Sequence, residues 1–364
     1  MSEKKIENLQ AAIKSKGYNW MSGKTSVSEL SADEFKARLG LLVGETELEA
    51  TARAIEAQTR LQAFAAPVAL PTAVDWRNYN GADWTTSVKD QGQCGSCVAH
   101  GTVAAIESRI KIVCKDPTLN KDLSEAHLFF CGGATCSGWN FTSALNFAQN
   151  TGIGEESCFP YTPVNQPCKP CTPYVKITGW AQVLTAADRK NILATKGPMI
   201  AGMAVYQDFS SYTSGVYKHV SGALRGYHCI MVAGYDDSQQ CWICKNSWGT
   251  GWGESGWFKI GYGECLIDTS FAFYDVDLNC PHPLCPPIYV TYLQKVLLLA
   301  KTNGAVRTAL CYYICGRGRP VMLSPTKAII VRNVKLILTR CPKYRLPFCR
   351  LLYCTPFQPF VPPR

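Results

Sequence analysis

Cysteine is the residue that most constrains how this chain of 364 residues can fold. Nineteen cysteines are present, and thirteen of them lie between Cys94 and Cys280. Cytosolic proteins seldom carry so many, whereas proteins of oxidising compartments use cysteines in disulfides. The count predicts a protein that is extracellular or lies in a lysosome-like or vacuole-like compartment. No apolar signal-peptide stretch follows Met1, so export is inferred from the cysteines alone.

The positive charge of the chain is concentrated at its C-terminal end. The formal net charge is +10, and residues 281–364 hold thirteen Lys and Arg but no Asp or Glu. A basic tail without interleaved aromatic residues does not predict a specific nucleic-acid partner. Three alternatives remain for this tail of unknown structure: a cationic appendage, a cysteine-rich extension that folds with disulfides, or a shifted reading frame. No run is long and apolar enough to predict a transmembrane segment.

The order of the predicted elements indicates an α+β protein. Residues 1–69 lack Cys and favour helices at 6–13, 32–39 and 47–64, the last with Thr46 as its N-cap. Apolar spacing predicts further helices at residues 97–114, 123–131, 142–150 and 186–196, the last with Thr185 as its N-cap. Short apolar runs then predict strands at residues 199–206, 229–235, 240–246, 256–263 and 271–278. Helices followed by strands favour a helical lobe, a sheet or barrel lobe and a cleft between them.

Cys97 is a candidate nucleophile because it opens a predicted helix. The segment Asp90-Gln-Gly-Gln-Cys-Gly-Ser-Cys97 ends at that helix start, where the helix dipole favours a thiolate. Two other interpretations stay open on these residues alone. Cys97 could be half of a disulfide, or Cys94 and Cys97 could form a redox C-x-x-C motif.

Two downstream motifs supply candidate partners for Cys97. His228 begins an apolar run in Gly226-Tyr-His-Cys-Ile, and Asn246 opens Asn-Ser-Trp-Gly-Thr-Gly-Trp-Gly253. With the Cys97 segment, these motifs resemble the papain and cathepsin family of cysteine peptidases over residues 70 to about 278. The resemblance implies a papain-like two-lobed fold, with a helical left lobe and an antiparallel, barrel-like right lobe around a cleft.

The resemblance also implies the roles of four site residues. Cys97 would attack the peptide carbonyl, and His228 would take its proton and later protonate the leaving amine. Asn246 would orient the imidazole, and Gln91 would donate to the oxyanion. No metal or cofactor is expected, and His100, which replaces a family Phe, is interpreted as a buried histidine and not as a second base.

Substrate contacts are implied by the same family positions. They are Gly95, Gly138, Trp139, Tyr227, Trp248 and Ser270. Trp139 stands where the family has glycine, so its ring either narrows the cleft or turns into the helical lobe. Ser270 falls at the floor of the S2 subsite and favours an apolar P2 side chain.

Disulfides are implied between Cys94 and Cys136 and between Cys131 and Cys168. A third family bridge lacks its second cysteine, so Cys265 either pairs with Cys241 or Cys244 or stays free. The spacing Cys168-Lys-Pro-Cys171 and Cys241-Trp-Ile-Cys244 also fits zinc ligands, but we interpret both pairs as bridged cysteines, not as a metal site.

The predicted domains are a helical propeptide at 1–69, a peptidase domain at 70–280 and the basic tail at 281–364. Residues 28–40 are similar to family prosegment sequence, which implies an inhibitor that crosses the cleft in the non-productive direction. We predict a monomeric cysteine endopeptidase that is made as a zymogen and acts on protein or peptide substrates. A catalytically silent papain-like binding protein is the alternative, against which the complete set of four site residues argues.

Overall fold

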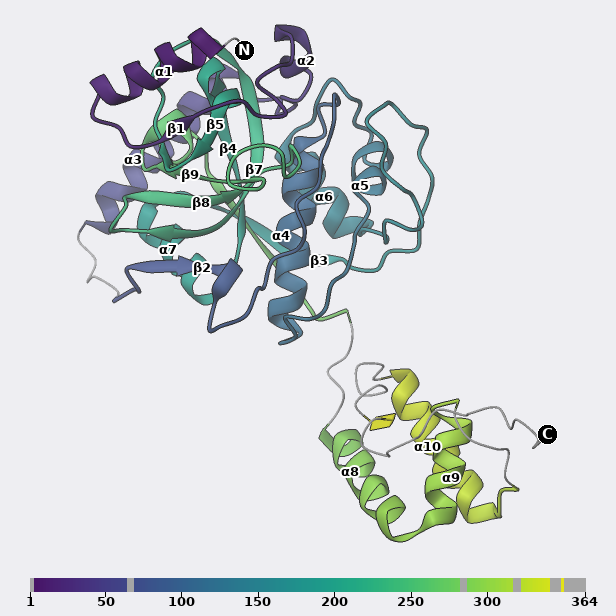
Figure 1. The fold of residues 1–364 in the computed structure, drawn as a ribbon. Coiled ribbons are helices and arrows are strands. Elements are labelled where there is room, and N and C mark those ends of the chain that lie inside the picture. The colour runs from purple at the N-terminus through teal and green to yellow at the C-terminus, as the bar shows by residue number, and fades with distance from the viewer. Residues whose placement is uncertain (1–2, 64–68, 282–286, 317–321, 341–347, 350–364) are drawn as a thin grey trace, which may run out of the picture. The chain divides into compact units, whose positions relative to one another are not determined.

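The computed structural model describes residues 3–63, 69–281, 287–316, 322–340 and 348–349 (Figure 1). Contacts along the chain divide it into two compact units, Met1–Asn279 and Cys280–Arg364. This boundary lies one residue before the predicted start of the tail at position 281. Each unit is considered separately below.

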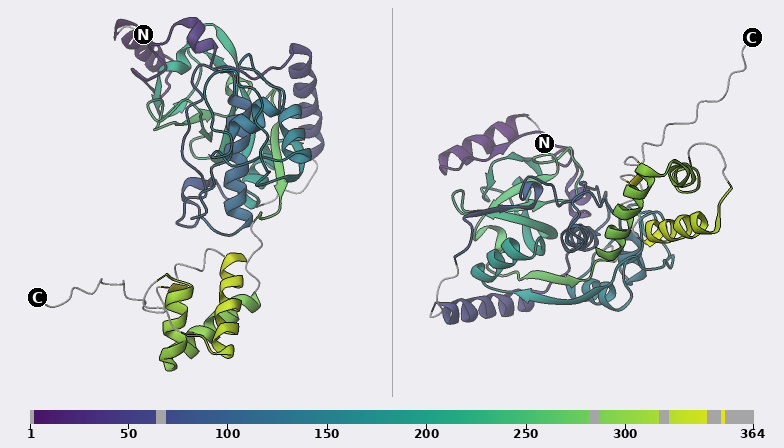
Figure 2. Two further views of the ribbon diagram at one scale, coloured as in Figure 1. Left: turned by 90° about the vertical axis from the view of Figure 1, so that its right-hand side faces the viewer. Right: turned by 90° about the horizontal axis from the view of Figure 1, so that it is seen from below.

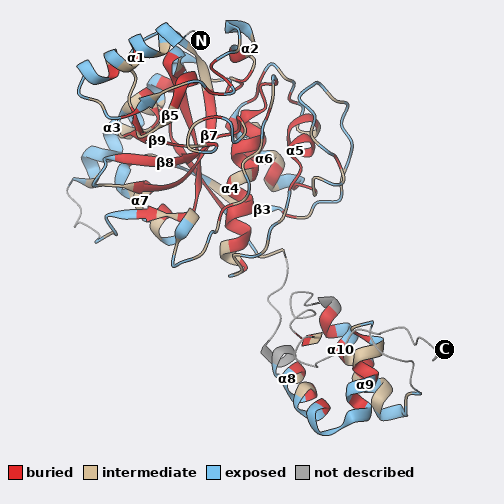
Figure 3. Cartoon of the chain, in the orientation of Figure 1, coloured by how far each residue is buried: buried red, intermediate tan, exposed pale blue. Residues whose placement is uncertain are grey.

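A helical lobe of the first unit is built around one buried helix. Its helices are α4 (Cys97–Val113), α5 (Glu125–Cys131) and α6 (Phe141–Asn150). α4 is buried along almost its whole length, as the red ribbon in Figure 3 shows. The side chains of Ser124 and Asn140 cap α5 and α6 by accepting from His127 N and Ser143 N.

The second lobe is an eight-stranded sheet. Its strand order is β3-β10-β4-β7-β8-β9-β6, with β2 paired to β7. The strands are β2 (Ala73–Asp75), β3 (Ile177–Val183), β4 (Met199–Tyr206), β6 (Val216–Tyr217), β7 (Leu224–Asp236), β8 (Cys241–Lys245), β9 (Trp257–Gly261) and β10 (Phe273–Leu278). Neighbouring strands of this sheet are antiparallel, except that β6 runs parallel to β9. The helical lobe and this sheet confirm the predicted α+β, papain-like architecture.

Gly101 lets the two lobes approach each other closely. A Cβ at this position of α4 would lie 2.6 Å from Cys229 Sγ and 3.3 Å from the carbonyl carbon of Ile230, both in β7. Real Cβ atoms essentially never show a distance of 2.6 Å, and 3.3 Å is already tight. The absence of a side chain therefore brings the first turn of α4 against the part of β7 that follows His228.

An N-terminal segment, residues 3–63, packs on the sheet lobe. It contains α1 (Glu3–Ser15), β1 (Met21–Ser22), α2 (Ala32–Lys36) and α3 (Glu45–Gln62), and α3 runs along the outside of the unit (Figure 2). β1 pairs with β5 (Tyr212–Ser214), and the fully buried ring of Trp20 lies 5.1 Å from that of Tyr217. Burial of a tryptophan fixes this segment to the sheet lobe.

Two local predictions for helix starts had different outcomes. Thr185 caps α7 (Ala186–Thr195) as predicted, with its side chain accepting from Asp188 N. Thr46 does not cap α3, because the helix begins at Glu45 and its N-cap is Gly44. The predicted end of this helix at Phe64 lies outside the described residues. β3 was not predicted from the sequence, because only its end residues Ile177 and Val183 are buried and it includes Gly179.

The structure contains both disulfides that the resemblance implied, Cys94–Cys136 and Cys131–Cys168, together with Cys158–Cys171. The interpretation of Cys241 and Cys244 as bridged cysteines was wrong. Both are buried free thiols, as is Cys265. Cys241 and Cys244 are three positions apart in β8, so their side chains point to opposite faces of the sheet.

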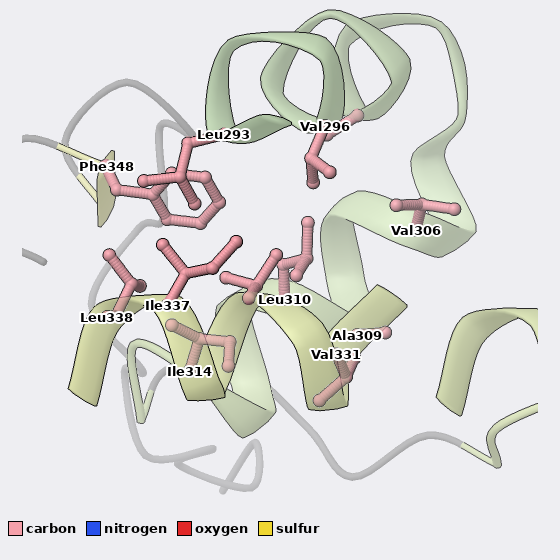
Figure 4. Packing of buried hydrophobic residues seen from close by; sticks show 12 residues of the cluster. Leu293, Val296, Val306, Ala309, Leu310, Ile314, Val331, Ile337, Leu338 and Phe348 are labelled. Carbon is pink, nitrogen blue, oxygen red and sulfur yellow. The ribbon is translucent and has the colours of Figure 1, made fainter. Parts of the chain in front are cut away.

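The C-terminal unit is a small helical bundle. It contains α8 (Pro287–Thr302), α9 (Gly304–Tyr313) and α10 (Pro325–Arg340), whose apolar side chains share one cluster (Figure 4). A disulfide joins Cys315 to Cys349. This arrangement agrees with the second alternative for the tail, an extension that folds with disulfides. Among the described residues, no helix has the length and apolar character needed to cross a membrane.

We predict that a protein truncated after Pro281 folds as the first unit does in the full chain. The apolar cluster of the bundle draws only on residues after position 290, and the strands described above all end by Leu278. Circular dichroism should therefore show the same unfolding midpoint for the sheet-containing unit with and without residues 282–364. Aggregation of the truncated protein, or a midpoint lower by 10 °C or more (roughly 2–5 kcal/mol for a domain of this size), would contradict the proposed boundary.

Candidate active site

Three separate elements bring the predicted catalytic residues together. Cys97 is the first residue of α4, His228 lies in β7, and Asn246 directly follows β8. His228 Nε2 lies 2.8 Å from Asn246 Oδ1, and Ser247 N donates to the same oxygen at 2.8 Å. Because that oxygen only accepts, Nε2 carries the proton and Nδ1 is left to act as a base. Nδ1 is buried without a hydrogen-bond partner in the described part of the chain.

Aromatic rings cover the bond between His228 and Asn246. The ring of Trp248 is fully buried and lies 4.9 Å from the imidazole. Trp248 also packs edge to face against Phe35 of α2, with the ring centroids 5.5 Å apart. Exclusion of water strengthens a hydrogen bond between neutral groups and holds the imidazole in one tautomer.

Gln91 is fixed by hydrogen bonds on both ends of its side chain. Its Oε1 accepts from Ser247 Oγ at 2.7 Å, which defines the orientation of the amide. Its Nε2 donates to the backbone oxygens of Cys94 at 2.8 Å and Arg38 at 3.0 Å. The distance to Arg38 is the one expected between an oxyanion donor and its acceptor. A backbone carbonyl of the N-terminal segment thus occupies the donor that a substrate would need.

Burial keeps the two reactive groups neutral in this structure. It raises the pKa of the Cys97 thiol to about 11, although backbone hydrogen bonds from Cys229 and Gly40 oppose this shift. The pKa of His228 is lowered to about 4, mainly by burial and in a smaller part by the positive charge of Arg38, while the hydrogen bond with Asn246 opposes this shift. Between these two values the thiol keeps its proton and the imidazole does not gain one. The nucleophilic thiolate and imidazolium pair is therefore absent while the segment covers the site.

Residues 38–42 of the N-terminal segment cross the site in a defined direction. Trp139 N donates to the backbone oxygen of Gly40 at 2.8 Å, and Leu42 N donates to the backbone oxygen of Trp139 at 2.8 Å. These bonds form a parallel bridge between Leu41 and Trp139. The segment therefore makes main-chain hydrogen bonds with the position that would hold a substrate strand.

Glycines allow this close crossing. A Cβ on Gly40 would lie 1.9 Å from the backbone oxygen of Gly95, and one on Gly138 would lie 2.6 Å from the backbone oxygen of Gly40. Gly138 also has a φ of 126°, which side chains rarely adopt. Gly95 and Gly138 thus provide a bare main-chain surface for a bound strand.

The indole of Trp139 turns into the helical lobe. Only 6% of the residue is exposed, and its ring lies 5.8 Å from that of Phe129 in an edge contact. A Cβ on Gly132 would lie 2.4 Å from the indole, so that glycine makes room for it. Of the two alternatives for Trp139, the structure shows the second: its main chain faces the crossing segment and its ring fills the core.

Tyr227 and Ser270 lie beside the path of the same segment. The backbone oxygen of Tyr227 accepts from Leu41 N at 3.2 Å. Ser270 borders a cavity of about 110 Å³ together with Leu42. The side chains of Leu41 and Phe271 lie close together, since both would come within 3 Å of a Cβ placed on Gly202.

Three residues of the site were not singled out from the sequence. They are Arg38 and Ser247, which bond to Gln91, and Tyr161, whose hydroxyl donates to the Gln91 backbone oxygen at 2.7 Å. Ser247 stands inside the Asn-Ser-Trp motif, which could have indicated it. No group of three or more potential metal ligands occurs within the described ranges.

We predict that Trp139→Gly destabilises the protein and leaves its peptide selectivity unchanged. Removal of a buried tryptophan ring costs about 3–5 kcal/mol, which denaturant unfolding of the variant and the parent protein would measure. A peptide library should report the same P2 and P3 preferences, because the ring does not face the crossing segment. Broader P2 acceptance with unchanged stability would show that the indole lines the cleft in the working protein.

Known proteins are similar to this chain in sequence and in fold. A model of the papain family cysteine proteases matches residues 70–274. Cysteine proteinase 1 of Entamoeba histolytica is 34% identical over 206 residues, which cover 52% of this chain and 63% of that protein. Cathepsin B-like CP1 of Giardia intestinalis is 32% identical over 282 residues, covering 70% and 89%. The structure of procathepsin L2 from Tenebrio molitor larval midgut has 26% identity and a TM-score of 0.62, covering 76% and 89%. The chain belongs to the papain family of cysteine proteases.

Proposed function

We propose that this chain is the inactive precursor of a cysteine endopeptidase with Cys97 as nucleophile. The observation that carries the proposal is the occupied oxyanion donor: Gln91 Nε2 binds the backbone oxygen of Arg38 at 3.0 Å. Residues 3–63 would be an inhibitory prosegment, and maturation would remove it by cleavage between α3 and β2. Family membership and the geometry of the four site residues support this assignment.

In the mature enzyme, water would reach the site again and stabilise charge on both reactive groups. The thiol proton of Cys97 would move to His228 Nδ1, and Asn246 would keep the imidazolium in place through Nε2. The thiolate would attack the peptide carbonyl, whose oxygen would take the place of the Arg38 oxygen at Gln91. His228 would then give its proton to the leaving amine, and water would hydrolyse the thioester.

The direction of residues 38–42 supports the inhibitory role of the prosegment. Their bridge to Trp139 is parallel, which fits the non-productive direction that the resemblance implies for a prosegment. The main chain therefore fills the subsites while no peptide bond is presented to Cys97 in the productive direction. Protein and peptide substrates would bind in the cleft once this segment has left.

An oxidising compartment, such as a lysosome-like organelle or the cell exterior, is the proposed location. The disulfides Cys94–Cys136, Cys131–Cys168 and Cys158–Cys171 support it. Acidic organelles would also provide conditions under which a prosegment can be released.

The test is hydrolysis of a fluorogenic peptide by protein matured at low pH. We expect Cys97→Ala and alkylation of the parent protein each to abolish turnover. Gln91→Ala should lower kcat by about ten- to a thousandfold with little change in KM, as expected for one oxyanion donor. Cys265→Ala is the matched control, since it removes another buried free thiol and should leave turnover unchanged. Undiminished turnover in Cys97→Ala would refute the mechanism, and a mature parent that binds peptides without hydrolysis would support a silent binding protein.

A further inference from the structure

His100 is a buried imidazole in the first turn of α4, on the same turn as Cys97. Only 4% of the residue is exposed. Burial lowers its pKa to about 3, so the ring is neutral at any pH at which the enzyme would act. A neutral histidine that never titrates is a poor proton shuttle, and its use must be sought in its hydrogen bonds.

One nitrogen of His100 is bound to the residue before the nucleophile. His100 Nδ1 lies 3.1 Å from the backbone oxygen of Ser96 and 3.3 Å from Ser96 Oγ. A carbonyl oxygen only accepts, so Nδ1 carries the proton and donates to Ser96. Ser96 is the N-cap of α4, and its side chain makes no cap bond to the helix. The imidazole therefore supplies a local restraint on Ser96 from within the helix.

The restraint continues from Ser96 to the oxyanion donor. Ser96 Oγ lies 2.7 Å from Tyr161 Oη, and Tyr161 Oη donates to the Gln91 backbone oxygen at 2.7 Å. Because the tyrosine proton is used on Gln91, the Ser96 hydroxyl must donate to Tyr161. The rings of His100 and Tyr161 also pack edge to face, with centroids 4.8 Å apart. One continuous chain of donors thus runs from His100 to the main chain of Gln91.

His100 also lies next to Ser247, the residue that binds the side chain of Gln91. It lines a cavity of about 10 Å³ together with Lys245, Asn246 and Ser247. Such a volume is at the lower limit for one water molecule. Ser247 is the residue that orients the Gln91 amide through Oε1. Tyr161 binds the backbone of Gln91 and Ser247 binds its side chain, and both residues lie next to His100.

We propose that His100 is a positioning residue that holds Ser96, Tyr161 and Gln91 in the arrangement needed to bind the oxyanion. The proposal rests on the proposed function. Ser96 immediately precedes Cys97, whose backbone N–H would be the second oxyanion donor. Loss of the Nδ1 proton donor would let both donors drift by tenths of an ångström, which weakens transition-state binding more than substrate binding.

The first experiment compares His100→Phe with His100→Asn in mature protein. Phenylalanine keeps the ring but has no donor, whereas asparagine can place its amide N–H near the position of Nδ1. We expect His100→Phe to lower kcat about ten-fold with KM within a factor of two, and His100→Asn to restore most of the loss. His127→Phe is the matched control: His127 is also a buried histidine, but it accepts from Gly154 N and lies away from Gln91. That variant should lose stability and keep its kcat.

A second variant tests the proposal even if His100→Phe does not fold. Tyr161→Phe breaks the same chain without changing ring packing and should give a similar loss of kcat. The double variant should lose no more than the larger single loss, because both changes cut one chain. Full kcat in His100→Phe or Tyr161→Phe, equal losses in His127→Phe, or no recovery in His100→Asn would each overturn the proposal. Failure of the proposed function is seen separately, as parent protein whose turnover survives Cys97→Ala.

Discussion

The contact between α4 and β7 is the interaction on which the whole site depends. α4 begins with Cys97, the proposed nucleophile, and β7 carries His228, the proposed base, so the distance between a helix and a strand would set the chemistry. Gly101 determines that distance because a Cβ there would overlap Cys229 and Ile230. A larger residue would push the first turn of α4 away from His228 without changing any catalytic side chain. Packing, and not the identity of the reactive groups alone, therefore defines the catalytic centre.

The N-terminal segment acts on this centre in two ways. Its main chain occupies the side-chain donor of Gln91, the proposed oxyanion donor, and the strand position beside Trp139. The segment also excludes water from the site, so the thiol of Cys97 and the imidazole of His228 both favour their neutral forms. The guanidinium of Arg38 adds to the effect on His228 and is itself held by Asp90 at 2.7 Å. Under the proposed function, inhibition by this segment would thus be both steric and electrostatic.

Much of the catalytic centre could be predicted from the sequence because its chemistry is carried by side chains in contiguous motifs. Cys97, His228 and Asn246 each stand in such a motif, and the structure brings them together. The oxygen of Arg38 could not be found in this way, since every residue has a backbone carbonyl. The direction of the Trp139 ring was also not predictable, because it depends on the space that Gly132 leaves for the indole at the C-terminal end of α5, and no sequence motif reports such packing.

Local rules failed where tertiary packing or strand geometry decided the outcome. Thr46 is a better N-cap residue than Gly44, yet α3 begins at Glu45, two residues earlier than a Thr46 cap would place it. The alternation of side chains in β8 separates Cys241 from Cys244, which the sequence spacing alone suggested as a pair. The basic tail lacks acidic residues, but its apolar positions recur at helical spacing and form a packed cluster.

The most direct test of segment control is the pH dependence of Cys97 alkylation, followed by mass spectrometry of the peptide that contains Cys97. In the precursor, burial raises the pKa of the thiol to about 11, so iodoacetamide should react slowly at neutral pH and faster only as the pH becomes strongly alkaline. In the matured protein, water and the imidazolium should stabilise the thiolate, so the rate should reach a plateau from about pH 5 upward. The same plateau in both forms would contradict the claim that the segment keeps the catalytic pair neutral.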